Sequence, residues 1–230
     1  MHRYLRFLLA TTVVPLGAGA QAPAPVVHPG EVYVAIYVEV LPGAAAAAAG
    51  LLKQYRDAAR KDEGNLRAEV VQEVNRPNRL AVMTIWADQK AWEAHGKAGH
   101  TVQSREKITA IQAAPSDERV HNGMFVGAKT APGAGALFVL THVDVPPPLR
   151  DTLIPMLKQL AEDTRKDAGN QRYEAQQQNN RTNHFTVVEA WANPKAYEAF
   201  VGTSVKRQFR EKFAPMTGAL YDERLYRAVD

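Results

Sequence analysis

Alternating hydrophobic and polar positions divide the chain into short strands and helices. Segments rich in β-branched and aromatic residues, with side chains alternating between two faces, predict strands. Segments with apolar side chains at i, i+4 spacing predict helices, and the first of these begins with six consecutive alanines. In the first half the elements follow in the order β-α-β-β-α-β. They are a strand at 31–41, a helix at 44–61, strands at 66–75 and 80–86, a helix from Asp88 to about 112 that pauses at Gly96 and Gly99, and a strand at 118–125.

The same pattern occurs a second time, 105 residues later, and matches without a gap from Val32 to His121. Residues 76–95 contain a turn, a strand ending in Trp86 and the start of a helix. Their counterparts at 181–200 repeat this arrangement, with Trp191 at the strand end. An ungapped repeat of this size indicates a duplicated domain rather than short solenoid units. The predicted organisation is a first domain at 31–125, a linker at 126–135 rich in Gly, Ala and Pro, and a second domain at 136–230.

Each half is predicted to be a four-stranded sheet with two helices on one face. The other face is also largely apolar, and a domain this small would expose it. We therefore expect the two sheets to pack face to face within one chain, which would behave as a monomer with an internal pseudo-dimer. The side chains expected at this seam are Tyr33, Tyr37, Phe138, Leu140 and His142.

Composition excludes several kinds of site. The chain contains no Cys, which excludes disulfides, thiol nucleophiles and thiolate metal sites. Its formal net charge is +4, from 28 basic and 24 acidic residues, and the two signs alternate along the chain. Because no basic stripe is present, nucleic-acid binding is not expected.

The N-terminus has the pattern of a secretory signal peptide. Arg3 and Arg6 precede an apolar run, and residues 18–20 form a small-x-small cleavage site. We expect a signal peptide at 1–20, a disordered lead-in at 21–30 and a periplasmic or secreted mature chain. The apolar run is too short to span a bilayer, and no other run is longer, so no membrane span is expected in the mature chain.

As a set, the motifs resemble those of the antibiotic biosynthesis monooxygenase family, within the dimeric α+β barrel superfamily. The resemblance implies an α+β fold of two ferredoxin-like βαββαβ domains packed sheet to sheet as an intramolecular dimeric barrel. The matching residues are 42–43, 62–65, 77–79, Trp86 and 91–95 in the first half, and 169–170, Asn183, Trp191 and 196–199 in the second.

Members of this family include cofactor-free oxygenases that act on quinols and polycyclic phenols, and haem-degrading enzymes. The resemblance implies a pocket in each half, between sheet and helices and near the strand-ending Trp. It also implies that no cofactor is needed, because the deprotonated aromatic substrate itself passes an electron to O2. The protein would hold the substrate, exclude water and stabilise the anion.

The residues expected to carry this chemistry lie near the strand-ending Trp. Trp86 and Trp191 either line a pocket, with the indole N–H bonding the substrate or O2, or close the core of their domain. His95 or His100 is a candidate general base for a phenolic proton, or else an ordinary histidine. No metal site is expected, because a spacing of five does not align two histidines on one helical face and no nearby carboxylate completes the set.

Three further residues are candidate substrate contacts, and each has a structural alternative. Asn65 follows the helix-ending Gly and could instead belong to the turn. Arg67 could hold an anionic substrate or form a surface ion pair. Tyr37 could donate to a substrate oxygen or pack in the seam.

The chain departs from the family's patterns at two positions. Haem-degrading members use an Asn on the first strand, where this chain has Ile36, and this makes haem binding the less favoured function. Some quinol-type members carry an Asn four residues before the Trp, where this chain has Val82. Two functions therefore remain open: oxidation of a quinol or polycyclic phenol by the first half, and non-catalytic binding of an aromatic or lipidic molecule. In the second half Phe200 and Val205 replace the two histidines, so it cannot perform the same proton transfer.

Overall fold

The computed structural model describes residues 30–127 and 131–230. The predicted signal peptide and nearly all of the lead-in lie outside these residues. The first half contains β1 (Val32–Val40), η1 (Pro42–Ala44), α1 (Ala45–Ala59), β2 (Asn65–Glu73), β3 (Arg79–Trp86), α2 (Gln89–Lys97), α3 (Gly99–Thr109) and β4 (Gln112–Phe125). The second half contains β5 (Leu137–Asp144), η2 (Pro147–Leu149), α4 (Arg150–Thr164), β6 (Asn170–Gln178), β7 (His184–Trp191), α5 (Pro194–Val201), α6 (Ser204–Phe213), η3 (Ala214–Met216) and β8 (Asp222–Ala228).

Two elements differ from the sequence prediction. The helix expected to pause and continue is two helices, because Ala98 adopts an extended conformation (φ −63°, ψ 141°) between α2 and α3. The last strand of the first half begins at Gln112, six residues before the predicted start at 118. Its early part pairs with the end of β1 through two register shifts, so pairing rather than local propensity extends it.

The eight strands form one closed antiparallel barrel in the order β1-β3-β2-β8-β5-β7-β6-β4, and β4 pairs back with β1. Each half supplies four neighbouring strands. The halves are hydrogen-bonded to each other at two junctions, β2 with β8 and β4 with β6. The predicted sheet-to-sheet pseudo-dimer is confirmed, and the junctions pair residues 71–73 with 226–228 and residues 121–125 with 175–178.

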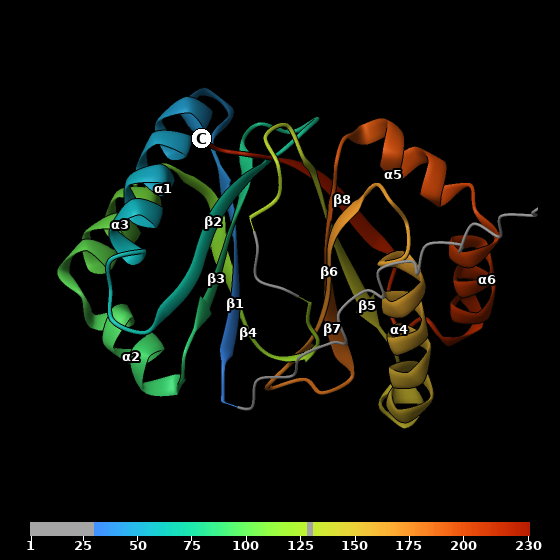
Figure 1. The fold of residues 1–230 in the computed structure, drawn as a ribbon. Helices are drawn as coiled ribbons and strands as arrows, with labels where there is room; N and C mark the ends of the chain where they lie inside the picture. Colours follow the sequence, from blue (N-terminus) through green and yellow to red (C-terminus); the bar gives the residue numbers. More distant parts are fainter. Residues whose placement is uncertain (1–29, 128–130) are drawn as a thin grey trace, which may run out of the picture.

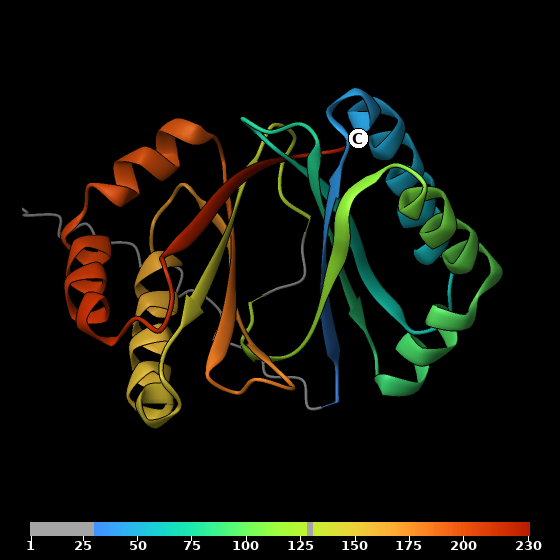
Figure 2. The same cartoon turned by 180° about the vertical axis from the view of Figure 1, so that it is seen from behind.

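The helices of the two halves lie on opposite outer sides of the barrel. Figures 1 and 2 show α1, α2 and α3 over the strands of the first half, and α4, α5 and α6 over those of the second. Each strand therefore has one side toward the helices and one toward the barrel interior. Within the described residues, no helix is long and apolar enough to cross a membrane.

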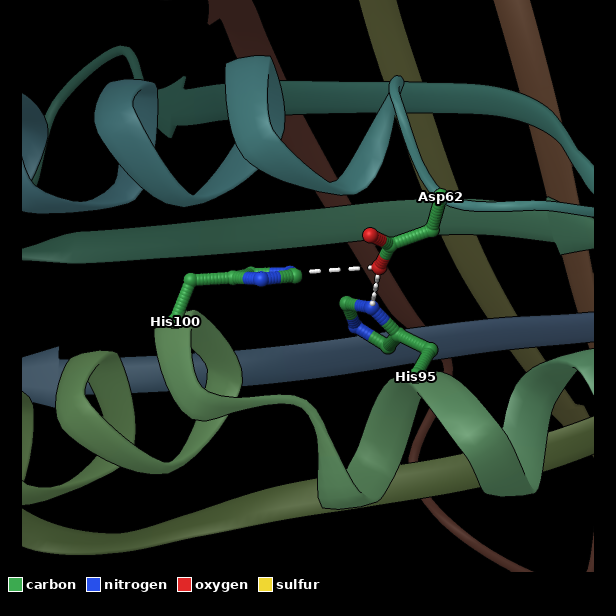
Figure 3. A group of neighbouring side chains, drawn as sticks. All are labelled: Asp62, His95 and His100. Atoms are coloured by element: carbon green, nitrogen blue, oxygen red, sulfur yellow. Dashed lines mark hydrogen bonds and ion pairs between the residues drawn. The ribbon is translucent and has the colours of Figure 1, made fainter.

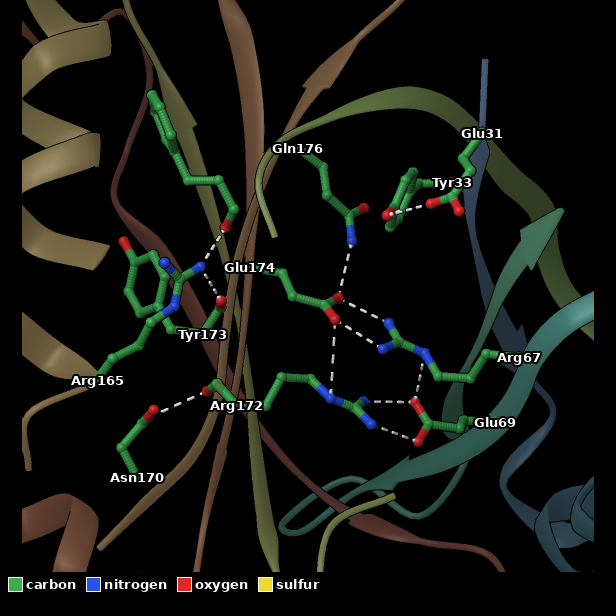
Figure 4. A network of polar contacts seen from close by, with 11 residues as sticks. Glu31, Tyr33, Arg67, Glu69, Arg165, Asn170, Arg172, Tyr173, Glu174 and Gln176 are labelled. Atoms are coloured by element: carbon green, nitrogen blue, oxygen red, sulfur yellow. Dashed lines mark hydrogen bonds and ion pairs between the residues drawn. The ribbon is translucent and has the colours of Figure 1, made fainter. Parts of the chain in front are cut away.

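The five predicted seam residues are all buried. Tyr37, Phe138 and Leu140 pack in one apolar cluster with residues of both halves. The interior also holds ion pairs that cross between the halves (Figure 4): Arg67 binds Glu174 through two contacts of 2.6 Å, and Arg172 binds Glu69 at 2.7 and 3.0 Å. Burial disfavours the Glu174 carboxylate, but the charges of Arg67 and Arg172 more than offset it and hold its pKa below the ordinary value.

Candidate functional site

Two adjoining cavities of about 310 Å³ each lie on the helix-facing side of the first-half sheet. Strands β1, β3 and β4 form one wall, and helices α1, α2 and α3 form the other. The two cavities share the lining residues Ile36, Tyr55, Thr101, Arg105 and Glu118. We call them together the first-half cavity. The family resemblance implies a pocket between sheet and helices in each half, and the first-half cavity lies in that place.

A chain of hydrogen bonds runs from the wall of this cavity through His95 to Asp62. His95 is 4% exposed, its Nδ1 lies 2.6 Å from Asp62 Oδ2, and its Nε2 lies 2.7 Å from the Tyr55 hydroxyl. An ionised carboxylate can only accept, so in the neutral imidazole Nδ1 carries the proton and donates it to Asp62. Nε2 then accepts from Tyr55. The Tyr55 oxygen keeps a lone pair that can accept a hydrogen bond from a molecule in the cavity.

Local structure brings these groups together from three separate segments. Asp62 lies in the turn that ends α1, where its carbonyl accepts from the amide of Asn65 at 3.1 Å. His95 is in the last turn of α2, and His100 is in the first turn of α3. Because the chain changes direction at Ala98, a separation of five residues places both rings beside Asp62 (Figure 3). Two histidines five residues apart do not share a face of one continuous helix, but here they lie on two helices, and Asp62 supplies the carboxylate that the sequence analysis did not find.

Burial sets the protonation of this group. Desolvation lowers the pKa of His95 more than the hydrogen bond and charge of Asp62 raise it, so the imidazole is neutral near pH 7. Burial likewise raises the pKa of Tyr55, which keeps its hydroxyl protonated. Trp86 stacks on the imidazole, with ring centroids 4.4 Å apart at an interplanar angle of 29°. His95 is therefore held as a neutral acceptor in a fixed orientation.

The candidate residues from sequence fall into two groups. His95 lines the first-half cavity and Trp86 packs behind it, but the Trp86 indole N–H donates to Thr84 Oγ1 at 2.9 Å rather than into the cavity. Arg67 and Tyr37 lie on the other side of the sheet, inside the barrel. The Tyr37 hydroxyl contacts His142 Nε2 at 2.8 Å. Of the two roles considered for Tyr37, it therefore has the one in the seam between the sheets.

The remaining two candidates also have structural partners. The side-chain amide of Asn65 donates to the carbonyl of Arg67 at 3.4 Å, at the start of β2. Trp191 is fully buried in the second-half core and donates its indole N–H to Glu189 Oε2 at 2.9 Å. None of Arg67, Tyr37, Asn65 and Trp191 lines the first-half cavity.

In the second half, charged side chains occupy the equivalent positions. Lys206, Glu189 and Glu223 stand where the first half has Thr101, Thr84 and Glu118. Lys206 Nζ lies 3.3 Å from Glu189 and 3.4 Å from Glu223, and Lys206 is 1% exposed. A separate pocket of about 290 Å³ is lined by residues of α4 and α6 and by no strand residue.

Sequence reasoning missed two members of the site, Tyr55 and Asp62. Tyr55 belongs to the apolar i, i+4 stripe that predicts α1, and nothing in that stripe distinguishes it from a packing residue. Asp62 is matched by Asp167 in the repeat, so the aspartate alone does not distinguish the first half from the second. Asp167 is a turn residue, since its Oδ1 accepts from the Gly169 amide at 2.8 Å. The signal in the first half was the combination of this Asp with histidines that the second half lacks.

Solved structures with the same fold include three that span most of the chain. A candidate monooxygenase from Fusobacterium nucleatum has a TM-score of 0.78 at 13% identity, covering 87% of this chain and 93% of that one. A candidate monooxygenase from Lactobacillus acidophilus has a TM-score of 0.72 at 12% identity, covering 87% and 95%. An anthrone oxidase-like protein has a TM-score of 0.69 at 11% identity, covering 87% and 91%. No curated protein matches the chain.

At these identities the structures establish a shared fold, and the sequence pattern of the family decides membership. The pattern described as antibiotic biosynthesis monooxygenase matches twice, at residues 31–107 and 136–212. Each match covers the greater part of one half of the barrel. The chain therefore belongs to the antibiotic biosynthesis monooxygenase family, with two domains of that family in tandem.

Proposed function

We propose that the first half oxidises a quinol or polycyclic phenol with O2 in the first-half cavity, without a cofactor. The observation that carries this proposal is the hydrogen-bonded series Tyr55–His95–Asp62, which begins at the cavity wall and ends at a carboxylate. The family and the monooxygenase and anthrone oxidase-like names of the structural neighbours support the reaction class. The substrate class rests on a mixed lining, in which the apolar side chains of Ile36, Val38, Leu52, Val82 and Ile108 could hold an aromatic ring and polar groups such as Tyr55 and Arg105 could bind its oxygen.

The first step is proton transfer from the substrate. A phenolic hydroxyl in the cavity donates to the Tyr55 oxygen while the Tyr55 proton passes to His95 Nε2. Asp62 accepts from Nδ1 and stabilises the imidazolium that forms. Arg105 lines both parts of the cavity, and its positive charge stabilises the substrate anion.

Oxidation then takes place between the substrate anion and O2. The anion gives one electron to O2, the resulting radical and superoxide combine, and the peroxide takes up the proton held by the enzyme. For an anthrone-type methylene, loss of water from this peroxide leaves a carbonyl. One oxygen atom stays in the product, the other leaves as water, and the four electrons that O2 gains come from the substrate. The cavity lies between the sheet and the helices, which shields the reactive intermediates in part from water.

Oxygen uptake with a panel of hydroquinones and anthrones tests this function. We expect turnover by the wild-type chain and a loss of rate in Tyr55→Phe, which removes the hydroxyl but keeps the ring. Tyr221→Phe is the matched control, because Tyr221 is in the second half and is 36% exposed. Uptake no faster than the uncatalysed reaction would overturn the proposal. A ligand retained in native mass spectrometry without turnover would instead support the binding-protein alternative.

We also propose that the mature chain acts outside the cytoplasm as a monomer. The signal-peptide pattern at 1–20 supports export, and the two hydrogen-bonded junctions between the halves supply the pairing that a dimer would otherwise provide. Fractionation of cells expressing the chain and sedimentation of the purified protein test these two points. A cytoplasmic, uncleaved chain would contradict the first, and an obligate dimer the second.

A further inference from the structure

Three potential metal ligands gather beside the first-half cavity. The side chains of Asp62, His95 and His100 each offer one ligand atom, and the three atoms lie within 4.8 Å of one another (Figure 3). They are the one such group among the described residues. The equivalent positions in the second half are Asp167, Phe200 and Val205, which cannot provide the same set.

The contact between His100 and Asp62 is not an ordinary hydrogen bond. His100 Nε2 lies 3.1 Å from Asp62 Oδ2, yet the nitrogen has no partner with hydrogen-bond geometry, although the atom itself is buried. His100 Nε2 faces Asp62 Oδ2 without a hydrogen bond between them. This arrangement fits two atoms that would both bind an ion placed beside them. That position is also adjacent to His95 Nδ1, which is 2.6 Å from the same oxygen.

We propose that Asp62 Oδ2, His95 Nδ1 and His100 Nε2 bind one divalent transition-metal ion per chain, for which Zn²⁺ is the probe. Two imidazoles and one carboxylate form a common ligand set for Zn²⁺ that leaves a coordination position open. The side chains of Asp62 and His100 are 24% and 31% exposed, which gives an ion and its water ligands access from solvent.

Binding would also change the hydrogen bond between His95 and Tyr55. An ion at Nδ1 requires the imidazole proton to be on Nε2, which then donates to the Tyr55 oxygen. This arrangement, with the second nitrogen of a ligating His held by an outer partner, is usual in metal sites. Since His95 can no longer accept a proton from Tyr55, the bound ion inhibits the oxidation; this consequence rests on the function proposed above.

Calorimetric titration of tag-free, chelator-treated full-length chain with ZnCl2 tests the site, and visible absorption with CoCl2 reports the coordination. We expect one ion per chain. His100→Val introduces the residue that the second half has at this position, and it should weaken binding by at least about 100-fold, more than loss of an outer-shell partner usually does. Tyr55→Phe should weaken it by about tenfold.

His184→Val is the matched control. His184 contacts Asp144 at 3.1 Å, but this pair belongs to no three-ligand group among the described residues, so binding should not change. The site would be refuted by the absence of stoichiometric binding, or by wild-type affinity in both His100→Val and Asp62→Asn with circular dichroism showing folded variants.

Oxygen uptake measured with and without ZnCl2 tests the inhibitory role separately. Inhibition in the wild type that His100→Val relieves supports it, and unchanged uptake by a Zn²⁺-saturated chain overturns it. If the chain oxidises none of the substrates, the proposed function fails, while the calorimetric result still decides whether the metal site exists.

Discussion

The ion pairs inside the barrel are matched between the two halves, whereas the sites beneath their helices differ. In the interior, Arg67 pairs with Glu174, which is the counterpart of Glu69, and Glu69 pairs with Arg172, which is the counterpart of Arg67. Under the helices, Thr84 and Thr101 line a cavity in the first half, whereas their counterparts Glu189 and Lys206 form an ion pair in the second. The difference shows that paired charges are kept in both halves where they cross the barrel, while each half has its own side chains beneath its helices.

The physical reason lies in the cost of incomplete ion pairs. An interior Arg and its Glu partner come from different halves, so a change in one half leaves a buried charge in the other. The second-half cluster is self-contained. Burial disfavours the Lys206 ammonium, but Glu189 and Glu223 raise its pKa above the ordinary value, so it remains charged among them. Such a cluster can replace a cavity without altering the opposite half.

The largest effect is expected when His95 of the first half is replaced by the phenylalanine that the second half has at the same position. His95→Phe introduces the side chain that packs on Trp191 at 4.8 Å as Phe200. We expect the oxidation rate to fall by about 10²–10⁴-fold, the usual contribution of a positioned proton acceptor. Oxygen uptake measures this, with denaturant unfolding to show that the variant is folded. The reverse change, Phe200→His, should create no activity, because Leu160 stands in place of Tyr55. Full activity in His95→Phe would contradict the assignment.

Because the ion pairs inside the barrel are matched between the halves, substitutions of Arg67 and of Arg172 should lower stability by equal amounts. Arg67→Met and Arg172→Met each leave a buried glutamate without its main partner, and each should lower the free energy of unfolding by about 3–5 kcal/mol. Urea denaturation measures both. The double variant Arg67→Met/Glu174→Leu removes both charges and should recover much of the loss. A loss below about 1 kcal/mol in either single variant would show that the pairs do not hold the halves together.

Beneath the helices, substitutions at equivalent positions of the two halves should lower the free energy of unfolding by different amounts. Lys206→Met leaves the Glu189 and Glu223 carboxylates without the ammonium that neutralises them, and should cost about 3 kcal/mol. Thr101→Val, at the matching position of the first half, removes a hydroxyl from a site that already contains space, and should cost about 1 kcal/mol or less. Unfolding in urea compares the two variants directly. Equal losses would mean that the second-half cluster does not stabilise its domain.

His121 should make the stability of the fold depend on pH; the second half has Tyr226 at the equivalent position. Burial lowers the pKa of His121 to about 4, against an ordinary value of 6.5. Between these values the unfolded chain binds a proton that the folded chain does not, so stability falls as pH falls from about 6.5 to about 4. At 1.36 kcal/mol per pKa unit the loss is roughly 3 kcal/mol. Urea unfolding across this range should show a shallower slope in His121→Gln; an unchanged slope would exclude His121 as its source.

The fold could be predicted from sequence because both of its signals are carried by neighbouring residues. The 105-residue repeat and the apolar periodicity are visible without any knowledge of contacts in space. The sequence prediction differs from the structure where contacts between distant residues determine where an element begins or ends. The change of direction at Ala98 and the early start of β4 at Gln112 depend on tertiary contacts, and neither residue has a local preference that would indicate them.

The site could be predicted only in part. His95 and His100 were recognisable because titratable side chains interrupt a helix pattern. Tyr55 was not, because a tyrosine in an apolar stripe has the same pattern whether its hydroxyl is used or not, and its partner is 40 residues away. Arg67 was assigned to the surface or to an anionic substrate, since its partner Glu174 lies 107 residues away across the barrel.

Closure of the barrel within one polypeptide has a consequence for how such a protein changes by mutation. In a symmetric dimer of identical chains one gene encodes both walls, and any substitution appears in both pockets. Here β2–β8 and β4–β6 join two halves that are encoded separately within one gene, so a substitution in one half leaves the sequence of the other unchanged. A substitution that removes a functional side chain from one half therefore leaves the side chains of the other half in place. Gene fusion in this way allows one copy to become scaffold while the other keeps its function.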